Sequence, residues 1–290
     1  MLKNRTEYAA FLFLGGLFRL LGITLSRKLA LLLGSLFYYA VPIRKQVVID
    51  NLRTAFPQKD EKEIKVLAKT AYRNFSLTFA ELLMLSSFKE EDIKRVVDIS
   101  GAEEVFKKYF GAGKPFFILT GHFGNWELFA VLPLLYHKTL YAMAKGMRNN
   151  YVSDWINKSR EKFGVKVVLL GASIRELYKV LKDNGAVLSV GDQRGPKEGV
   201  RVNFFGKSTA AFSGTAALAL KTNAPIIMAF NIRQKNLNYK TICTELKYDD
   251  LTGSDEEKIQ AVCQRYFTHL ESVIKEYPEQ WFWMHKIWKY

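Results

Sequence analysis

The chain has 290 residues, 49% of them hydrophobic and 14% aromatic, which is enough to bury a substantial core. Its net charge is +15, from 43 basic and 28 acidic residues, so we expect an acidic partner such as anionic lipid or an acidic protein. The basic residues are spread out and form no nucleic-acid-binding motif, which argues against nucleic acid as the partner.

Residues 1–45 are much more apolar than the rest of the chain and contain two apolar runs, 8–25 and 29–43. A full membrane span needs about 20 apolar residues. The first run carries a charge at Arg19, and the second run is short. Two amphipathic or re-entrant helices in one leaflet therefore fit at least as well as a single span. A helical hairpin docked on the rest of the protein is the alternative.

Basic residues flank both apolar runs, where they suit the headgroups of anionic lipid on the cytoplasmic side of a membrane. They are Lys3, Arg5, Arg19, Arg27, Lys28, Arg44 and Lys45. We expect residues 1–45 to anchor the protein to a membrane and residues 46–290 to form its main domain.

After the anchor, helical periodicity predicts helices at 44–56, 60–83 and 90–97. From residue 115 onward, strand-like and helix-like segments alternate. The expected strands are 116–120, 140–144, 165–170, 186–191, 225–232 and 239–246, the last antiparallel at an edge. The expected helices are 125–135, 151–163, 173–182, 213–221 and 255–276. This alternation predicts an α/β fold with a mostly parallel central sheet flanked by helices.

The run Phe116–Thr120 predicts a buried strand, and Gly121 and His122 follow it directly. Open α/β sheets keep their sites in loops at the carboxyl ends of strands. A histidine there can act as a general base, and a nearby carboxylate can orient it. Glu127 lies five residues on, about 140° around an ideal helix, so the two side chains meet only if the chain turns between them. Gly121 and Gly124 permit that turn. A histidine that only packs at the strand end is the alternative.

Further polar residues are expected near the same edge of the sheet. Asp192 and Gln193 follow another strand, and Asp192 can bind an acceptor hydroxyl or hold an arginine; an ordinary polar turn is the alternative. Arg160, Lys145 and Arg148 together can hold a phosphate or a charged sugar. For Lys145 and Arg148 taken singly, a solvated helix face is favoured.

No segment predicts a nucleotide or metal site. Residues 204–209 can offer backbone amides at a helix N-terminus, but they lack the glycine spacing of a Walker loop. The cysteines form no motif and fit a reducing compartment. The metal-ligating side chains without ligand spacing are Cys243, Cys263, His137, His269 and His285. We therefore expect no metal and no cofactor.

Taken in chain order, several segments resemble the bacterial late lipid A acyltransferases, the lauroyl and myristoyl transferase family within the lysophospholipid acyltransferase superfamily. The segments are 51–57 (NLRTAFP), 121–127 (GHFGNWE), 160–164 (REKFG), 192–193 (DQ), 204–209 (FFGKST), 213–215 (SGT) and 277–281 (YPEQW). They run through nearly the whole chain, and the superfamily is marked by a histidine followed, after four residues, by Asp or Glu.

The resemblance implies a reaction for His122 and Glu127. His122 would deprotonate an acceptor hydroxyl, Glu127 would orient and charge the imidazole, and the hydroxyl would attack the thioester of an acyl chain on acyl carrier protein. No acyl-enzyme and no cofactor are implied. The residues implied in substrate binding are Gly121, Asn125, Lys145, Arg148, Arg160, Asp192 and Gln193.

By the same resemblance, the acceptor is a glycolipid, a lipid A precursor of the Kdo-lipid IVA type, at the cytoplasmic face of the inner membrane. Residues 46–290 would be the acyltransferase domain. Two positions depart from the family: Lys145, where arginine is frequent, and the tail 283–287, where two basic residues usually follow the histidine. Phosphatidylinositol mannoside as acceptor, acyl-CoA as donor, and a catalytically inactive lipid-binding scaffold are the alternatives.

Overall fold

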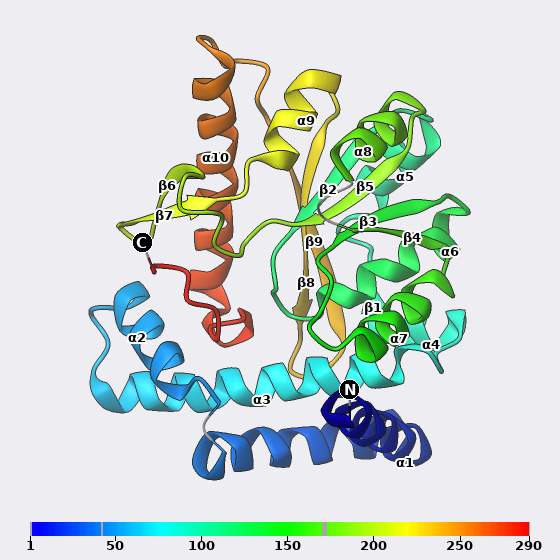
Figure 1. Ribbon diagram of the computed structural model, residues 1–290, viewed down its shortest axis with the longest axis vertical. Helices are drawn as coiled ribbons and strands as arrows, with labels where there is room; N and C mark the ends of the chain where they lie inside the picture. Colours follow the sequence, from blue (N-terminus) through cyan, green and yellow to red (C-terminus); the bar gives the residue numbers. More distant parts are fainter. Residues whose placement is uncertain (1, 42, 170–172, 290) are drawn as a thin grey trace.

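The computed structural model describes residues 2–41, 43–169 and 173–289 (Figure 1). Seven strands form one sheet in the order β1-β9-β8-β2-β5-β3-β4. They are β1 (Val97–Asp98), β2 (Phe116–Thr120), β3 (Leu140–Ala144), β4 (Val165–Leu169), β5 (Ala186–Val190), β8 (Ile226–Arg233) and β9 (Tyr239–Leu246). All neighbours are parallel except β8 and β9. The predicted α/β class with a mostly parallel sheet is confirmed.

Helices cover both faces of the sheet. One face packs against α8 (Ser173–Lys182), α9 (Gly214–Thr222) and α10 (Asp255–Glu276), and the other against α5 (Glu103–Gly111), η1 (Trp126–Val131) and α6 (Leu132–Tyr136). Strand β2 shows why both faces need cover, since Phe117 and Leu119 enter the first core while Phe116 and Ile118 enter the second. Such a strand is apolar without alternation, as expected for a parallel sheet buried on both sides.

Two predictions about the strands need correction. Strand β9 is antiparallel to β8, as expected, but it is not at the edge, because the two-residue strand β1 pairs along its other side. Residues 204–209 do not lead into a helix but form a hairpin of β6 (Val200–Phe204) and β7 (Lys207–Ala211). Phe205 and Gly206 both adopt positive φ, the geometry of a tight two-residue hairpin turn. The expected strand 165–170 is found as β4, and position 170 lies outside the described residues.

The N-terminal segment forms α1 (Leu2–Ala40), which bends at Gly22, where φ is 68°. It lies along α3 (Glu61–Leu85), the long helix beneath the sheet (Figure 1). At Gly34 a Cβ atom would lie 2.7 Å from Cα of Arg73, so the close approach of the two helices requires glycine. Within the described residues, α1 is the one helix long and apolar enough to cross a membrane, a test that buried core helices also pass.

The remaining helices are short. They are α2 (Lys45–Ala55), α4 (Glu90–Val96), α7 (Asn150–Glu161) and the 3-10 turn η2 (Pro278–Gln280).

The register of β2 and β5 matters most for the site. Thr120 pairs with Val190, so the residues two positions beyond each strand, His122 and Asp192, leave the sheet side by side.

Candidate active site

The turn after β2 is held from several directions. Gly124 has φ 55°, and a Cβ atom there would lie 1.9 Å from the carbonyl oxygen of Asn231, so only glycine fits. The Gly124 N–H donates to the Gln280 carbonyl at 2.9 Å, and the Phe282 N–H donates to the His122 carbonyl at 2.9 Å. The C-terminal segment thus fixes the backbone on which His122 sits.

The His122 ring is oriented by Asp192. His122 Nδ1 lies 2.7 Å from Asp192 Oδ1, and the His122 backbone N–H donates to Asp192 Oδ2 at 2.6 Å. Trp281 Nε1 donates to the same Oδ2 at 2.7 Å. Burial disfavours the carboxylate, but its electrostatic interaction with the His122 ring and these hydrogen bonds outweigh burial and hold the pKa of Asp192 below its ordinary value. A carboxylate at Nδ1 places the ring proton on Nδ1 and leaves Nε2 with its lone pair.

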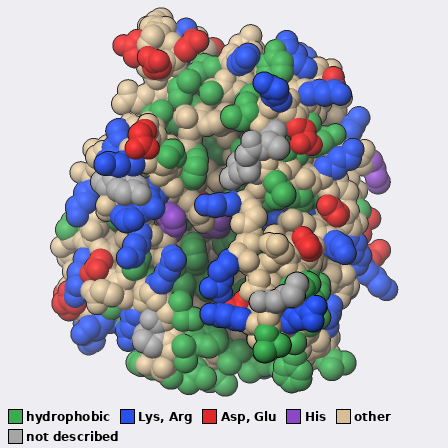
Figure 2. All heavy atoms as spheres, in the orientation of Figure 1, with side chains coloured by type: hydrophobic (Ala, Val, Ile, Leu, Met, Phe, Trp, Pro, Cys, Tyr) green, Lys and Arg blue, Asp and Glu red, His purple; other side chains and the backbone are tan. Residues whose placement is uncertain are grey.

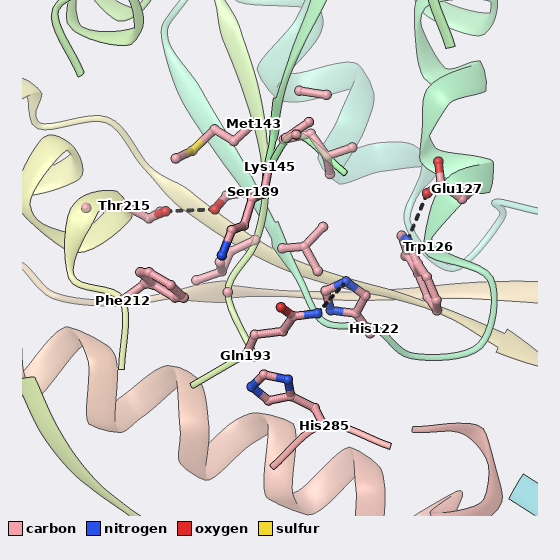
Figure 3. A pocket seen from close by; sticks show the side chains of 18 of the residues that line it. His122, Trp126, Glu127, Met143, Lys145, Ser189, Gln193, Phe212, Thr215 and His285 are labelled. Atoms are coloured by element: carbon pink, nitrogen blue, oxygen red, sulfur yellow. Dashed lines mark hydrogen bonds between the residues drawn. The ribbon is translucent and has the colours of Figure 1, made fainter. Parts of the chain in front are cut away.

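His122 Nε2 points toward the Gln193 side chain, with Gln193 Nε2 at 3.3 Å (Figure 3). The Trp126 ring stands edge-on to the imidazole at a centroid distance of 4.8 Å. The His122 side chain keeps 20% of its surface exposed, whereas that of Asp192 keeps 2%. A buried carboxylate therefore holds a partly exposed imidazole, and the ring nitrogen Nε2 can be reached from the cavity.

Glu127 does not orient His122. Arg160 of α7 binds it with two hydrogen bonds, Nε to Oε2 at 2.8 Å and Nη2 to Oε1 at 2.6 Å. Trp126 Nε1 also donates to Glu127 Oε1 at 3.0 Å (Figure 3). Among the described residues, no hydrogen bond joins Glu127 and His122. The 3-10 helix η1 begins right after Asn125 and turns the carboxylate toward α7. The expectation that Glu127 holds the imidazole is corrected: Asp192 holds it.

The Glu127–Arg160 pair is a buried ion pair. The two side chains keep 7% and 20% of their surface exposed. Burial disfavours the charged form of Glu127, but the charge and hydrogen bonds of Arg160 keep the pKa of this carboxyl below its ordinary value. The pair thus stays charged and holds the Arg160 guanidinium at the wall of the cavity beside His122.

The other residues predicted to bind substrate fall into two groups, those that line the cavity and those that do not. Lys145, Arg160 and Gln193 line the same cavity as His122. Gly121 lies behind Asp192, where a Cβ atom would be 3.0 Å from Oδ2. Arg148 is exposed and pairs with Glu7 of α1 at 2.8 Å. Asn125 is buried: its amide donates to Glu81 at 2.9 Å, and its oxygen accepts the Glu127 N–H at 3.2 Å.

A cavity of about 1030 Å³ contains the site. Residues of α1 and α3 line its part nearest the N-terminal helix, and residues of β5, α9 and α10 line its interior. Its large apolar side chains include Phe11, Phe75, Phe79, Leu82, Leu188, Leu218, Val262 and Phe267. Figure 2 shows the hollow on this face, with hydrophobic side chains along it and basic side chains around its mouth. The cavity is therefore mainly apolar and reaches the His122 imidazole.

Comparison with known proteins assigns the family. Residues 2–290 match the family described as "Bacterial lipid A biosynthesis acyltransferase". The chain belongs to this family. The match spans nearly the whole chain and includes both the N-terminal helix and the C-terminal segment that pins His122.

Individual relatives of this lipid A acyltransferase family member are distant. It is 21% identical to the lipid A biosynthesis palmitoleoyltransferase of Escherichia coli over 251 residues, 85% of this chain and 79% of the relative. It is 20% identical to the phosphatidylinositol mannoside acyltransferase of Mycolicibacterium smegmatis over 77% of this chain and 72% of the relative. It is 24% identical to the enzyme of that name from Mycobacterium tuberculosis, over about half of each chain: 51% of this one and 48% of the relative.

Sequence reasoning missed part of the site of this family member. Trp281 lies in a family segment, but nothing local shows that its indole reaches Asp192. Ser189 and Thr215 share a hydrogen bond of 2.8 Å in the cavity wall, across two elements distant in sequence (Figure 3). His285 was set aside as isolated, yet it lines the cavity. Its place two residues after the tryptophan of the tail was the available signal.

A buried polar network also escaped prediction. Glu81 of α3 accepts from Arg27 of α1 at 2.8 Å and from Asn125 at 2.9 Å. Tyr239 and Arg233 donate to the same carboxylate. Because Asn125 belongs to the turn that carries His122, this network joins the N-terminal helix of the family member to its site.

Proposed function

We propose that this protein is an O-acyltransferase that moves a fatty acyl chain from acyl carrier protein to a hydroxyl of a lipid A precursor of the Kdo-lipid IVA type. The observation that carries the proposal is the His122 imidazole, fixed at Nδ1 by buried Asp192 and open at Nε2 toward a large apolar cavity. Membership of the lipid A acyltransferase family supports it.

In the proposed reaction, His122 Nε2 takes the proton of the acceptor hydroxyl while the oxygen attacks the thioester carbonyl. The resulting tetrahedral intermediate collapses and expels the thiolate of the donor. The proton on Nε2 then passes to the sulfur, which restores the neutral ring. Asp192 stabilises the imidazolium that exists between these steps and keeps the ring in the tautomer that can accept. The chain needs no nucleophile of its own.

The Glu127–Arg160 pair is proposed to serve the acceptor. Arg160 also donates to Asn157 at 3.1 Å, so its guanidinium is held rigidly at the cavity wall. A fixed guanidinium suits a phosphate or a sugar hydroxyl, and exposed Lys145 on the same cavity adds a second cation. An acceptor with phosphates on a sugar fits these positions.

The acceptor has an alternative. Relatives of this chain are named for lipid A and for phosphatidylinositol mannoside, which are both glycolipids with anionic phosphate. A phosphatidylinositol mannoside acceptor therefore remains the second candidate, with the same chemistry at His122. Acyl-CoA is the alternative donor.

Acyl carrier protein is proposed as donor because it is strongly acidic and this chain carries +15. The Michaelis constant for acyl carrier protein donors is expected to rise several-fold between 0.1 M and 1 M salt, since the Debye length falls from about 10 Å to about 3 Å. The control is the same steady-state measurement with a short acyl-pantetheine donor, whose Michaelis constant should not rise with salt. If salt changed the Michaelis constants of the two donors equally, the alternative donor would be favoured. It would also be favoured if the protein used acyl-CoA as well as it uses acyl carrier protein donors.

The site of action is proposed to be the cytoplasmic face of the inner membrane. The outer surface of α1 exposes large apolar side chains, at the lower edge of Figure 2. They include Phe13, Leu20, Leu25, Leu32 and Leu36. Removing α1 is a poor test, because Glu81 would lose the partner Arg27 inside the protein. Substitution of exposed residues avoids this problem.

A variant with Phe13, Leu20, Leu32 and Leu36 all changed to Gln is expected to bind anionic phospholipid vesicles at least tenfold more weakly, with an unchanged melting temperature. Each buried side chain of this size contributes about 1.5–3 kcal/mol, and about 1.4 kcal/mol is tenfold in affinity. Vesicle co-sedimentation measures the effect, and Leu169→Gln, an exposed leucine on β4, is the control. Full binding by the fourfold variant would exclude α1 as the membrane contact.

The activity itself is tested by mass spectrometry. The protein is incubated with acyl carrier proteins of several chain lengths and with a lipid A precursor or phosphatidylinositol mannoside in mixed micelles. One added acyl chain on the lipid A precursor is the expected product, absent with His122→Ala. Acylation of the mannoside alone would favour the second candidate. No acyl transfer to any acceptor would favour a catalytically inactive scaffold.

A further inference from the structure

An acyl transfer of the proposed kind needs hydrogen-bond donors for the oxygen of the tetrahedral intermediate. The backbone amides beside His122 are already engaged. The His122 N–H donates to Asp192, the Phe123 N–H to the Gly121 carbonyl at 2.7 Å, and the Gly124 N–H to Gln280. None of these three amides is available to the oxyanion, so the side chains that face His122 are candidates for the donors.

Gln193 is one side chain in position. With the proton of His122 on Nδ1, His122 Nε2 can only accept, so the Gln193 amide donates to it across 3.3 Å. An arriving acceptor hydroxyl must donate to the same nitrogen. It therefore displaces the Gln193 N–H, which becomes free beside the reacting carbon at the moment when the negative charge forms.

His285 is the second. The backbone N–H of Arg194 donates to His285 Nε2 at 2.9 Å. A backbone amide cannot accept, so Nε2 carries no proton, and the neutral ring carries its proton on Nδ1. Burial is the main reason that the pKa of His285 falls to about 4, so the ring stays neutral at physiological pH.

The placement of His285 fits a donor. The residue lines the cavity, and its ring lies beside Gln193 on the side of the cavity that holds His122 (Figure 3). Its backbone is fixed, because the Asn51 amide donates to the His285 carbonyl at 2.7 Å and to the Trp283 carbonyl at 2.8 Å. Among the described residues, no hydrogen bond engages His285 Nδ1.

We propose that the Gln193 amide and the Nδ1–H of His285 form the oxyanion hole of the acyl transfer. The inference rests on the proposed function and names the donors for the thioester oxygen. Gln193 and Arg194 are consecutive after Asp192, so one short loop after β5 orients the base, supplies one donor and fixes the tautomer of the other.

Three cations of the described chain line the cavity and are the rival donors. Arg194 already donates from Nη1 to the Lys286 carbonyl at 3.1 Å. The Arg160 guanidinium already donates twice to Glu127 and once to Asn157. Lys145 is exposed, and its ammonium sits on a long four-carbon side chain with several rotatable bonds, whereas an oxyanion hole requires donors fixed before the charge develops. The Gln193 and His285 side chains meet that requirement.

The test compares His285→Phe and Gln193→Leu with wild type in the transfer assay. Each variant is expected to lower kcat about 10²–10³-fold, the usual effect of losing one oxyanion donor, with the Michaelis constant for the acceptor little changed. His285→Gln should recover much of the rate, because its oxygen can accept from Arg194 while its amide donates. His269→Phe, a histidine outside the cavity that packs on Phe230, is the control and should keep wild-type kinetics.

A binding measurement separates this role from a structural one. Two pantetheine analogues with the same alkyl chain are titrated by calorimetry: a trifluoromethyl ketone, which hydrates to a tetrahedral centre, and a thioether without a carbonyl. Both variants should bind the ketone at least tenfold more weakly and the thioether as wild type does. Equal loss of both ligands, a raised Michaelis constant with normal kcat, or full activity would overturn the proposal. Lack of transfer by wild type would instead count against the proposed function.

Discussion

His122→Ala is expected to lower kcat by at least about 10²–10⁴-fold while donor binding and the melting temperature stay near those of wild type. An alcohol holds its proton tightly at neutral pH, and a general base within about 3 Å contributes a factor of this size. His122 Nε2 is the nitrogen open to the cavity, while Nδ1 is committed to Asp192.

Stopped assays of acyl transfer give kcat, and titration with the thioether analogue gives the affinity for the donor. His137→Asn is the matched control, since His137 has a left-handed φ of 51° that asparagine tolerates and it lies outside the cavity. A His122→Ala protein that keeps full turnover but melts at a lower temperature would mean that the imidazole only packs against Trp126 and Phe282.

Asp192→Asn is expected to cost nearly as much, about 10²–10⁴-fold in kcat, although the shape of the side chain is kept. Asparagine can still accept from Trp281 and from the His122 backbone with its oxygen, which leaves its NH₂ group facing His122 Nδ1. That group can only donate, so the ring proton moves to Nε2 and the base loses the lone pair it needs.

The same assay measures this variant, with two-dimensional NMR of the ring nitrogens as a direct readout of the tautomer. Glu127→Gln is the comparison, because Glu127 contacts Arg160 and Trp126 and should leave the tautomer unchanged. If Glu127→Gln shifts the ring proton and Asp192→Asn does not, then Glu127 and not Asp192 orients the His122 ring.

Much of the sheet could be predicted from the sequence, because its strands are continuous apolar runs bounded by polar or glycine residues. Strands β2, β3 and β9 and helix α10 have the predicted bounds. Helix α5 was missed because it is only nine residues long, although Val105, Phe106, Tyr109 and Phe110 recur at helical spacing. The two-residue strand β1 was missed for a different reason: it exists only because β9 pairs with it.

Some residues of the site were predicted from the sequence, but their pairings were not, and Trp281, Ser189, Thr215 and His285 were missed. His122 and Asp192 both follow strands, and their contact depends on the neighbouring register of β2 and β5, which no local pattern encodes. Glu127 was expected at His122 because it lies five residues away, but a 3-10 helix begins between them and turns the carboxylate to α7. Spacing alone could not show which of two carboxylates reaches the ring.

The N-terminal segment illustrates the same limit. Its apolar composition predicted a membrane anchor, but composition did not show that it packs on α3 through apolar side chains, a close glycine contact and a buried ion pair. Gly34 permits the close approach, and Arg27 meets Glu81 inside the protein. Arg27 was expected at lipid headgroups, yet its side chain is only 9% exposed, so that expectation is corrected.

A double-mutant cycle on acyl transfer tests the His122–Asp192 base most directly. The kcat values of wild type, His122→Ala, Asp192→Asn and the double variant are measured with one acyl carrier protein donor and one glycolipid acceptor. We expect the double variant to be as slow as His122→Ala alone, because a carboxylate that acts only through the ring has no effect once the ring is gone. Losses that multiply, or a transfer rate unaffected by His122→Ala, would contradict the mechanism.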